Sequence, residues 1–151
     1  KGTPSPKGNE LTPVAIDSNI AVALFDSDPD LGPVLRAAVI ERIESARTFF
    51  LPVMCLGEFW RVATEVRGLN KSPDATARFL AELLEELPLL LPGPRYGSIL
   101  LGLLKLHRPR GASVFDFQIA AVCLEHEVDA VWTFDQKFPR VAGLAVVDPS
   151  R

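Results

Sequence analysis

The chain has 151 residues, of which 48% are hydrophobic and 23% charged, a balance that is typical of one folded domain and excludes a disordered chain. It contains no run of about 18 apolar residues, so no membrane-spanning helix is expected. Sixteen Lys and Arg against 19 Asp and Glu give a net charge of −3. This charge argues against a protein that binds nucleic acid through an overall positive surface. It does not argue against a nuclease, because catalytic carboxylates themselves lower the net charge.

The first residues differ in composition from the rest. Residues 1–12 contain two prolines and two glycines, show no periodic pattern and lack the apolar core of a secretory signal. We expect them to form a disordered tail, either native or left from expression. Residues 13–151 are expected to form the folded domain.

Short β-like runs alternate with helical patterns along this domain. In chain order we predict a strand at Val14–Ile16, a helix at Asp30–Ala46, a strand at Thr48–Leu51, a helix at Val53–Arg67 closed by Gly68, a helix at Pro73–Leu87 capped by Ser72, a strand at Leu89–Leu91, a helix at Tyr96–His107, a helix at 114–127 capped by Ser113, and strands at Ala130–Thr133 and Leu144–Val147. Because the five strands are apolar throughout, they predict an α/β fold, with a parallel central sheet and helices on both faces.

Two cysteines, Cys55 and Cys123, lie in apolar helical patterns. Neither has the Cys or His spacing of a zinc site. They are typical of small core residues in a reducing compartment, which predicts a cytoplasmic protein.

Four acidic residues fall at one edge of the predicted sheet, the carboxyl edge at which such sheets bind ligands. Asp17 directly follows the first strand, and Asp135 comes just after the fourth. Glu58 and Asp116 lie in the first two turns of helices that begin at the same edge. Four carboxylates in one cleft require either cations or unusual pKa values.

Each acid also has a structural interpretation that involves no ligand. Asp17 could cap a helix that begins at Ser18 or Asn19, and Glu58 could belong to a charged helix face with Arg61 and Glu65. Asp116 could form a capping box with Ser113, and Asp135 could cap a turn before Phe138. Each explains a single acid, whereas a metal centre explains all four.

Mg²⁺ and Mn²⁺ are hard cations that prefer carboxylate oxygens. They activate water and neutralise the charge that develops on a phosphate, which is the chemistry of phosphodiester hydrolysis. The chain has only two histidines, and it lacks both a G-x-S-x-G sequence and a Walker loop. The residues therefore predict metal-assisted hydrolysis.

The segments AIDSN, LGEFWRV, FDFQIAAVCLEH and VWTFDQKF, the last followed by GLAVVDP, together resemble the PIN-domain family, and within it the VapC-type toxins of bacterial toxin–antitoxin pairs. The resemblance covers about residues 14–149. It implies that Asp17, Glu58, Asp116 and Asp135 hold Mg²⁺ or Mn²⁺ in an endoribonuclease. It also implies a homodimer and a cognate antitoxin, received in a groove beside the helix at residues 73–87.

Two hydroxyl residues match the family's supporting positions, Ser18 after the first acid and Thr133 before the last. Gln136 departs from members that carry a further acid there, so a second, fully occupied metal site is not implied. Gly57 is a poor helix residue, and we expect it to allow another backbone to approach closely.

Basic residues near the acids are candidates for RNA contact. Arg108 and Arg110 precede Asp116, and Lys137 and Arg140 follow Asp135. Cations around an anionic centre suit a nucleic-acid backbone. The same residues are equally typical of solvated loops.

Two other classes of function remain open. The first is an Asp-phosphoacceptor or phosphatase domain that uses Asp17, although Asn19 stands where dehalogenase-type phosphatases need a second acid. The second is a non-catalytic PIN-like interaction module. Only a metal-binding or activity assay separates this module from a nuclease.

Overall fold

The computed structural model describes residues 13–26, 33, 37, 41 and 48–151, and it contains one sheet of five parallel strands in the order β3-β2-β1-β4-β5. The strands are β1 (Val14–Ile16), β2 (Phe49–Pro52), β3 (Leu89–Leu90), β4 (Ala130–Trp132) and β5 (Ala145–Val147). In the central strand β1, Val14 pairs with Phe49 on one side and with Ala130 on the other. The parallel sheet confirms the predicted α/β class.

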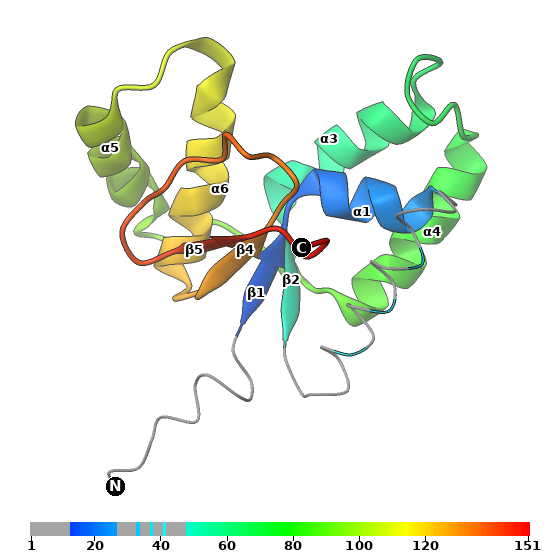
Figure 1. The fold of residues 1–151 in the computed structure, drawn as a ribbon, viewed down its shortest axis with the longest axis horizontal. Helices are drawn as coiled ribbons and strands as arrows, with labels where there is room; N and C mark the ends of the chain where they lie inside the picture. The colour runs from blue at the N-terminus through cyan, green and yellow to red at the C-terminus, as the bar shows by residue number, and fades with distance from the viewer. Residues whose placement is uncertain (1–12, 27–32, 34–36, 38–40, 42–47) are drawn as a thin grey trace, which may run out of the picture.

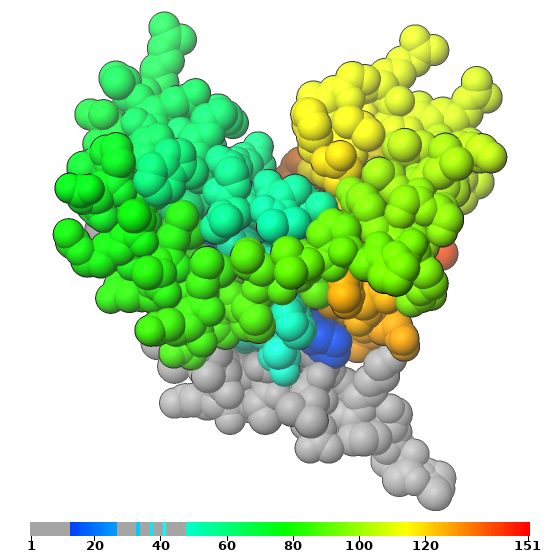
Figure 2. All heavy atoms as spheres, turned by 180° about the vertical axis from the view of Figure 1, so that it is seen from behind, coloured from blue at the N-terminus to red at the C-terminus, as the bar shows by residue number. Residues whose placement is uncertain are grey.

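Five α-helices of the described residues surround the sheet: α1 (Ser18–Phe25), α3 (Val53–Thr64), α4 (Pro73–Glu86), α5 (Tyr96–His107) and α6 (Val114–Glu125). In Figure 1, α5 and α6 stand on one side of the strands and α3 and α4 on the other. Figure 2 shows the molecule hollowed between these two lobes. None of the described helices is long and apolar enough to cross a membrane.

The core explains why the inner strands β1, β2 and β4 are apolar. Val14 and Ile16 of β1 are fully buried because neighbouring elements cover both faces of the sheet. Phe25 of α1 stacks on Phe79 of α4 at 4.5 Å between ring centroids, and Phe59 of α3 joins them. The apolar face of α4 therefore packs against the core through Phe79. Both cysteines are free and buried, as predicted.

The C-terminal end of α3 differs from the prediction. The helix from Val53 stops at Thr64 instead of Arg67, and Gly68 lies in the following turn, where it donates to the Glu65 carbonyl oxygen at 3.0 Å. Any Cβ at Gly68 would collide with the Val62 carbonyl group. The glycine is thus needed for this turn and does not cap the helix.

The predicted capping box before α6 is wrong. Ser113 ends a 3₁₀ turn (Gly111–Ser113), and its hydroxyl donates to the Arg110 carbonyl oxygen at 2.8 Å instead of capping α6. Asp116 stands in the first turn of α6 without that partner. Of the helix predicted at residues 30–46, only residues 33, 37 and 41 are described, and these are helical. The predicted tail, residues 1–12, lies outside the described residues.

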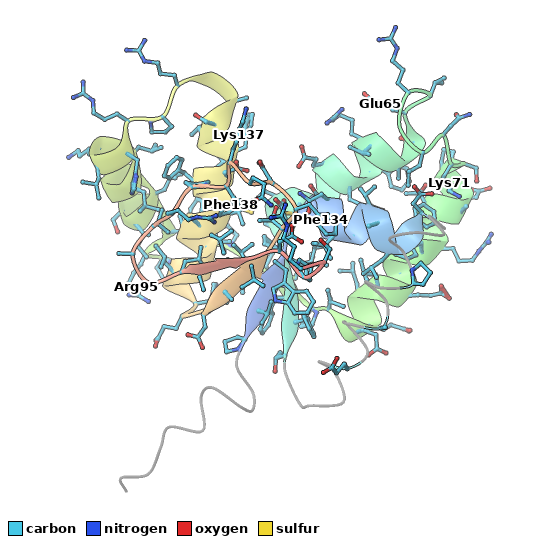
Figure 3. All side chains as sticks on the ribbon, viewed as in Figure 1. Glu65, Lys71, Arg95, Phe134, Lys137 and Phe138 are labelled. Atoms are coloured by element: carbon cyan, nitrogen blue, oxygen red, sulfur yellow. The ribbon has the colours of Figure 1, made fainter. Side chains whose placement is uncertain are left out.

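A buried carboxylate at the end of α6 holds the segment that joins β3 to α5. Glu125 Oε1 accepts a hydrogen bond from Gly93 N at 2.7 Å, and Oε2 accepts one from Arg95 N at 2.8 Å. Burial favours the neutral acid, but the two N–H donors outweigh it, so the pKa of Glu125 lies below its ordinary value. Arg95 and this segment lie away from the hollow between the lobes (Figure 3).

Glu125→Gln is expected to lower the Tm at pH 7, because an amide can accept only one of the two N–H bonds and leaves the other unpaired. A lowered pKa stabilises the fold above the ordinary pKa of Glu, and this contribution is lost as pH falls through the folded-state value. Thermal unfolding from pH 7 down to pH 3 should therefore show the two proteins converging in acid. Glu82→Gln, on the exposed face of α4, is the matched control, and equal Tm values for Glu125→Gln and wild type at pH 7 would contradict the assignment.

Candidate metal centre

The four predicted acids line one cavity of about 380 Å³. Its remaining lining residues are Ser18, Asn19, Val22 and Val62. The acids come from the end of β1, from α3, from the start of α6 and from the segment after β4. Four distant parts of the sequence therefore meet at the carboxyl edge of the sheet.

Asp17 both caps a helix and faces the cavity. Its Oδ1 accepts a hydrogen bond from Ser18 N at 2.7 Å, which begins α1, and its Oδ2 accepts one from Thr133 Oγ1 at 2.9 Å. Burial raises the pKa of Asp17, the two hydrogen bonds oppose this, and the charges of Glu58 and Asp135 add to it, with a net rise. The Asp17 side chain therefore caps α1 and also lines the cavity, the two positions predicted for it.

Asp116 lies half-buried in the first turn of α6, and no other described residue donates a hydrogen bond to its carboxylate or forms an ion pair with it. Burial raises its pKa to about 6, with further contributions from the negative charges of Asp17, Asp135 and Glu58. Its negative charge therefore has no counter-charge among the residues that the structure describes.

Glu58 has one polar partner inside the cavity and one outside. Its Oε1 accepts from Ser18 Oγ at 2.7 Å, while Oε2 lies 3.8 Å from the Arg61 guanidinium. Arg61 also pairs with Glu65 at 3.1 Å, so the predicted charged face of this helix exists as well. Ser18 thus orients Glu58 toward the other acids.

The expectation for Gly57 is wrong. Apart from its own helix and its chain neighbours, no atom of the described residues lies within 4 Å of where its Cβ would be. Gly57→Ala should therefore raise the free energy of unfolding by about 0.5–1 kcal/mol, because glycine loses more backbone entropy in a helix. Thermal unfolding should show a Tm about 2 °C higher with unchanged activity. A lower Tm would mean that the position needs glycine.

Asp135 is fixed by the turn in which it lies. Its Oδ1 accepts from Lys137 N at 2.8 Å, and its carbonyl oxygen accepts from Phe138 N at 3.1 Å. Its own N–H donates to Thr133 Oγ1 at 3.0 Å. The predicted turn cap is therefore present, and the carboxylate still lines the cavity.

Asn19 is a residue that the sequence analysis did not assign to the site. Its Nδ2 donates to Thr133 Oγ1 at 3.1 Å, and its Oδ1 accepts from Phe134 N at 3.2 Å. These bonds connect the first turn of α1 to the segment after β4, which contains Phe134 (Figure 3). The only sequence signal was an amide two residues after Asp17, in the turn that faces the predicted edge.

The donor set fits a hard divalent cation. All four charged ligand candidates are carboxylates. Besides burial, the charges of the neighbouring acids help to raise the pKa values of Asp17 and Asp116, and a cation would relieve this repulsion. Within residues 13–26, 33, 37, 41 and 48–151, no three His, Cys, Asp or Glu side chains are already arranged to hold an ion. We expect the carboxylates to draw together when a cation binds.

The predicted RNA-contacting residues lie outside the cavity lining. Arg108 ends α5 in a left-handed conformation with φ of 53°, and Arg110 follows in the connection to α6. Lys137 lies in the turn after β4, where its backbone N–H donates to Asp135 Oδ1 at 2.8 Å. These three side chains and that of Arg140 are exposed, and the role of all four in RNA contact stays a prediction.

The sequence matches the PIN domain family over residues 14–144, and the chain therefore belongs to this family. A search of curated protein sequences finds no significant match. The fold is similar to solved structures of VapBC and VapC proteins, which are 16–20% identical to this chain.

VapBC2 from Rickettsia felis, bound to a DNA fragment of its promoter, has a TM-score of 0.66 at 18% identity over 89% of this chain and 97% of its own. VapBC-1 from nontypeable Haemophilus influenzae has a TM-score of 0.65 at 20% identity over 92% and 99%. The sarcin–ricin loop cleaving toxin VapC20 from Mycobacterium tuberculosis has a TM-score of 0.60 at 16% identity over 83% and 92%. At these identities the similarity establishes the fold alone.

Proposed function

We propose that the protein is a divalent-metal-dependent endoribonuclease that acts as the toxin of a toxin–antitoxin pair. The observation that carries the proposal is the meeting of Asp17, Glu58, Asp116 and Asp135 in one cavity. Membership of the PIN domain family supports it, as does the similarity in fold to a toxin described as cleaving the sarcin–ricin loop.

The residues of the cavity have three kinds of role in this proposal: holding the metal ion, orienting water and positioning the carboxylates. A bound Mg²⁺ or Mn²⁺ supplies water activation and charge neutralisation at the scissile phosphate. Asp17, Asp116 and Asp135 hold the ion, and Glu58 serves as a further ligand or orients the attacking water. Thr133 and Ser18 fix the carboxylates of Asp17 and Glu58 through bonds of 2.9 and 2.7 Å.

Outside the cavity, Arg108, Arg110 and Lys137 would hold the RNA backbone around this anionic centre. A cognate antitoxin would bind the protein, and its similarity in fold to the solved VapBC structures supports this part of the proposal. We further propose a homodimer that works in the cytoplasm.

The proposal is tested by incubating the antitoxin-free protein with total RNA and Mn²⁺ or Mg²⁺, with and without a chelator. Asp116→Asn is the inactive variant, and Asp74→Asn, an exposed acid in the first turn of α4, is the control for loss of one carboxylate. We expect cleavage by the wild type and by Asp74→Asn that the chelator abolishes. Asp116→Asn should show none.

Three results would contradict the proposal. Cleavage that persists in chelator would exclude a metal-dependent reaction. A folded protein that neither binds Mn²⁺ nor cleaves RNA would favour the non-catalytic interaction module. Stable phosphorylation of Asp17 by a small phosphodonor, without RNA cleavage, would favour the phosphoacceptor.

A further inference from the structure

A second cavity, of about 360 Å³, lies beside the acidic one, between α3 and α6. It is lined by Met54, Cys55, Glu58, Ala112, Phe115, Asp116, Gln118 and Ile119. Two of these residues, Glu58 and Asp116, also line the first cavity. The two hollows therefore share a wall that consists of two proposed metal ligands.

The second cavity is apolar apart from this wall and one amide. Phe115 is 60% exposed, more than any other described aromatic side chain, although an exposed phenylalanine ring is costly in water. Met54 and Ile119 add further apolar surface, and Gln118 adds an uncharged side chain that both donates and accepts hydrogen bonds. A flat aromatic ring together with one amide suits a planar ligand that has polar edges.

The shared wall indicates which planar ligand this is. If the acids in the first cavity hold a phosphodiester, the base of an adjacent nucleotide lies only one sugar away. The second cavity, on the other side of the shared wall, is within that reach. An apolar protein side chain would instead bury the Asp116 carboxylate, which has no ion-pair partner among the described residues, and this is unfavourable. Nucleic acid brings divalent cations to this wall, so a nucleobase fits better than an apolar peptide.

We propose that the cavity between α3 and α6 binds the nucleobase adjacent to the scissile phosphate, with Phe115 as the stacking surface and Gln118 as the contact to the base edge. This inference rests on the proposed function and adds a determinant of sequence preference to it. Every base has a flat π face, so stacking on an aromatic side chain strengthens binding whatever the base. Truncation of Phe115 should therefore weaken RNA binding without affecting the metal site.

The test measures binding of five fluorescein-labelled decamers by fluorescence anisotropy, with Ca²⁺ in place of Mn²⁺ so that binding is recorded without turnover. Four decamers are homopolymers of A, C, G and U, and the fifth is an abasic ribose-phosphate chain. The proteins are wild type, Phe115→Ala, Phe115→Tyr and Leu106→Ala. Leu106 is the control, because it is 75% exposed at the end of α5 and lies outside both cavities.

We expect Phe115→Ala to weaken binding of the preferred homopolymer roughly tenfold and to bring the four affinities closer together. Phe115→Tyr should restore binding, Leu106→Ala should leave it unchanged, and the abasic decamer should bind wild type and Phe115→Ala equally. Gln118→Leu should reduce the preference among bases more than the overall affinity.

The inference is overturned if wild type binds the homopolymers and Phe115→Ala binds all of them equally well, the result expected of a ring that serves a protein partner. The proposed function would survive that result. If wild type binds none of the five decamers, the proposed function fails, and the base site fails with it. An equal loss for the abasic decamer would show that Phe115 supports the fold and not a base.

Discussion

Asp116→Asn is expected to abolish metal-dependent RNA cleavage and, at the same time, to stabilise the metal-free protein at pH 8. Activity is lost because the amide cannot supply the charge that a divalent cation requires. Stability rises because the amide removes a carboxylate that is partly buried beside Asp17, Asp135 and Glu58. A catalytic residue whose removal stabilises the fold is typical of a site that needs a ligand to balance its charges.

The pH dependence of this effect has a definite sign. The folded protein holds the Asp116 proton up to a pKa of about 6, whereas the unfolded chain releases it near 3.8, so the charged form is disfavoured by folding. The free energy of unfolding therefore falls as pH rises between these values. Allowing for the partial exposure of Asp116, we expect Asp116→Asn to gain about 1 kcal/mol at pH 8, or roughly 2–4 °C in Tm.

Thermal unfolding at pH 8 and pH 4 in the presence of a chelator measures this difference. The gain should disappear at pH 4, where Asp116 is protonated and resembles the amide. Asp74→Asn should show no gain at either pH. An Asp116→Asn variant with a lower Tm than wild type at pH 8, or with full cleavage activity, would contradict the assignment of Asp116 to the metal centre.

Thr133→Val is expected to damage both the fold and the site, although the two side chains have nearly the same shape. Thr133 is 2% exposed, and its hydroxyl donates to Asp17 and accepts from Asn19 and from the Asp135 backbone N–H. Valine leaves these buried groups without a partner, at a cost of about 2–4 kcal/mol in the free energy of unfolding. The Tm should fall by roughly 5–10 °C.

The effect of Thr133→Val on activity follows from the same bonds. Without the hydroxyl, one oxygen of Asp17 and the turn that carries Asp135 lose the bonds that fix their positions, so both proposed ligands are less well placed. Loss of such an orienting contact typically reduces metal affinity or activity about 10–100-fold. Thr133→Ser, which keeps the hydroxyl, should retain most of both properties.

Mn²⁺ affinity by calorimetry, measured beside the Tm, separates the two consequences of Thr133→Val. If the variant kept wild-type affinity and cleavage despite a lower Tm, Thr133 would be a purely structural residue. If its Tm also stayed unchanged, the hydrogen bonds described here would be absent in solution.

Much of the fold could be predicted because its signals are local. The helix at Tyr96–His107 and the Ser72 cap of α4 depend on spacing and on residues within one turn. The meeting of the acids followed from a rule of parallel sheets, in which strand ends and the starts of flanking helices share one edge. That rule requires no knowledge of side-chain contacts.

The remaining features depend on contacts between distant parts of the sequence. Asn19 bonds to Thr133 across 114 positions, and no local pattern reports such a pair. Ser113 matched a capping box by spacing, but the 3₁₀ turn before α6 directs its hydroxyl to Arg110. The base site proposed around Phe115 arises only where α3 and α6 face each other, so the sequence alone gave no reason to separate this ring from the core.

The most direct test of the central claim is a crystal structure of the protein soaked in Mn²⁺, with anomalous diffraction recorded at a wavelength where manganese scatters strongly. We predict an anomalous peak in the cavity about 2.1 Å from carboxylate oxygens of Asp17, Asp116 and Asp135. The same soak of Asp116→Asn should show a weaker peak or none. Two results would contradict the assignment of these four acids to a metal centre: a wild-type cavity without manganese at saturating concentration, or manganese bound only outside the cavity at Glu65, just after α3.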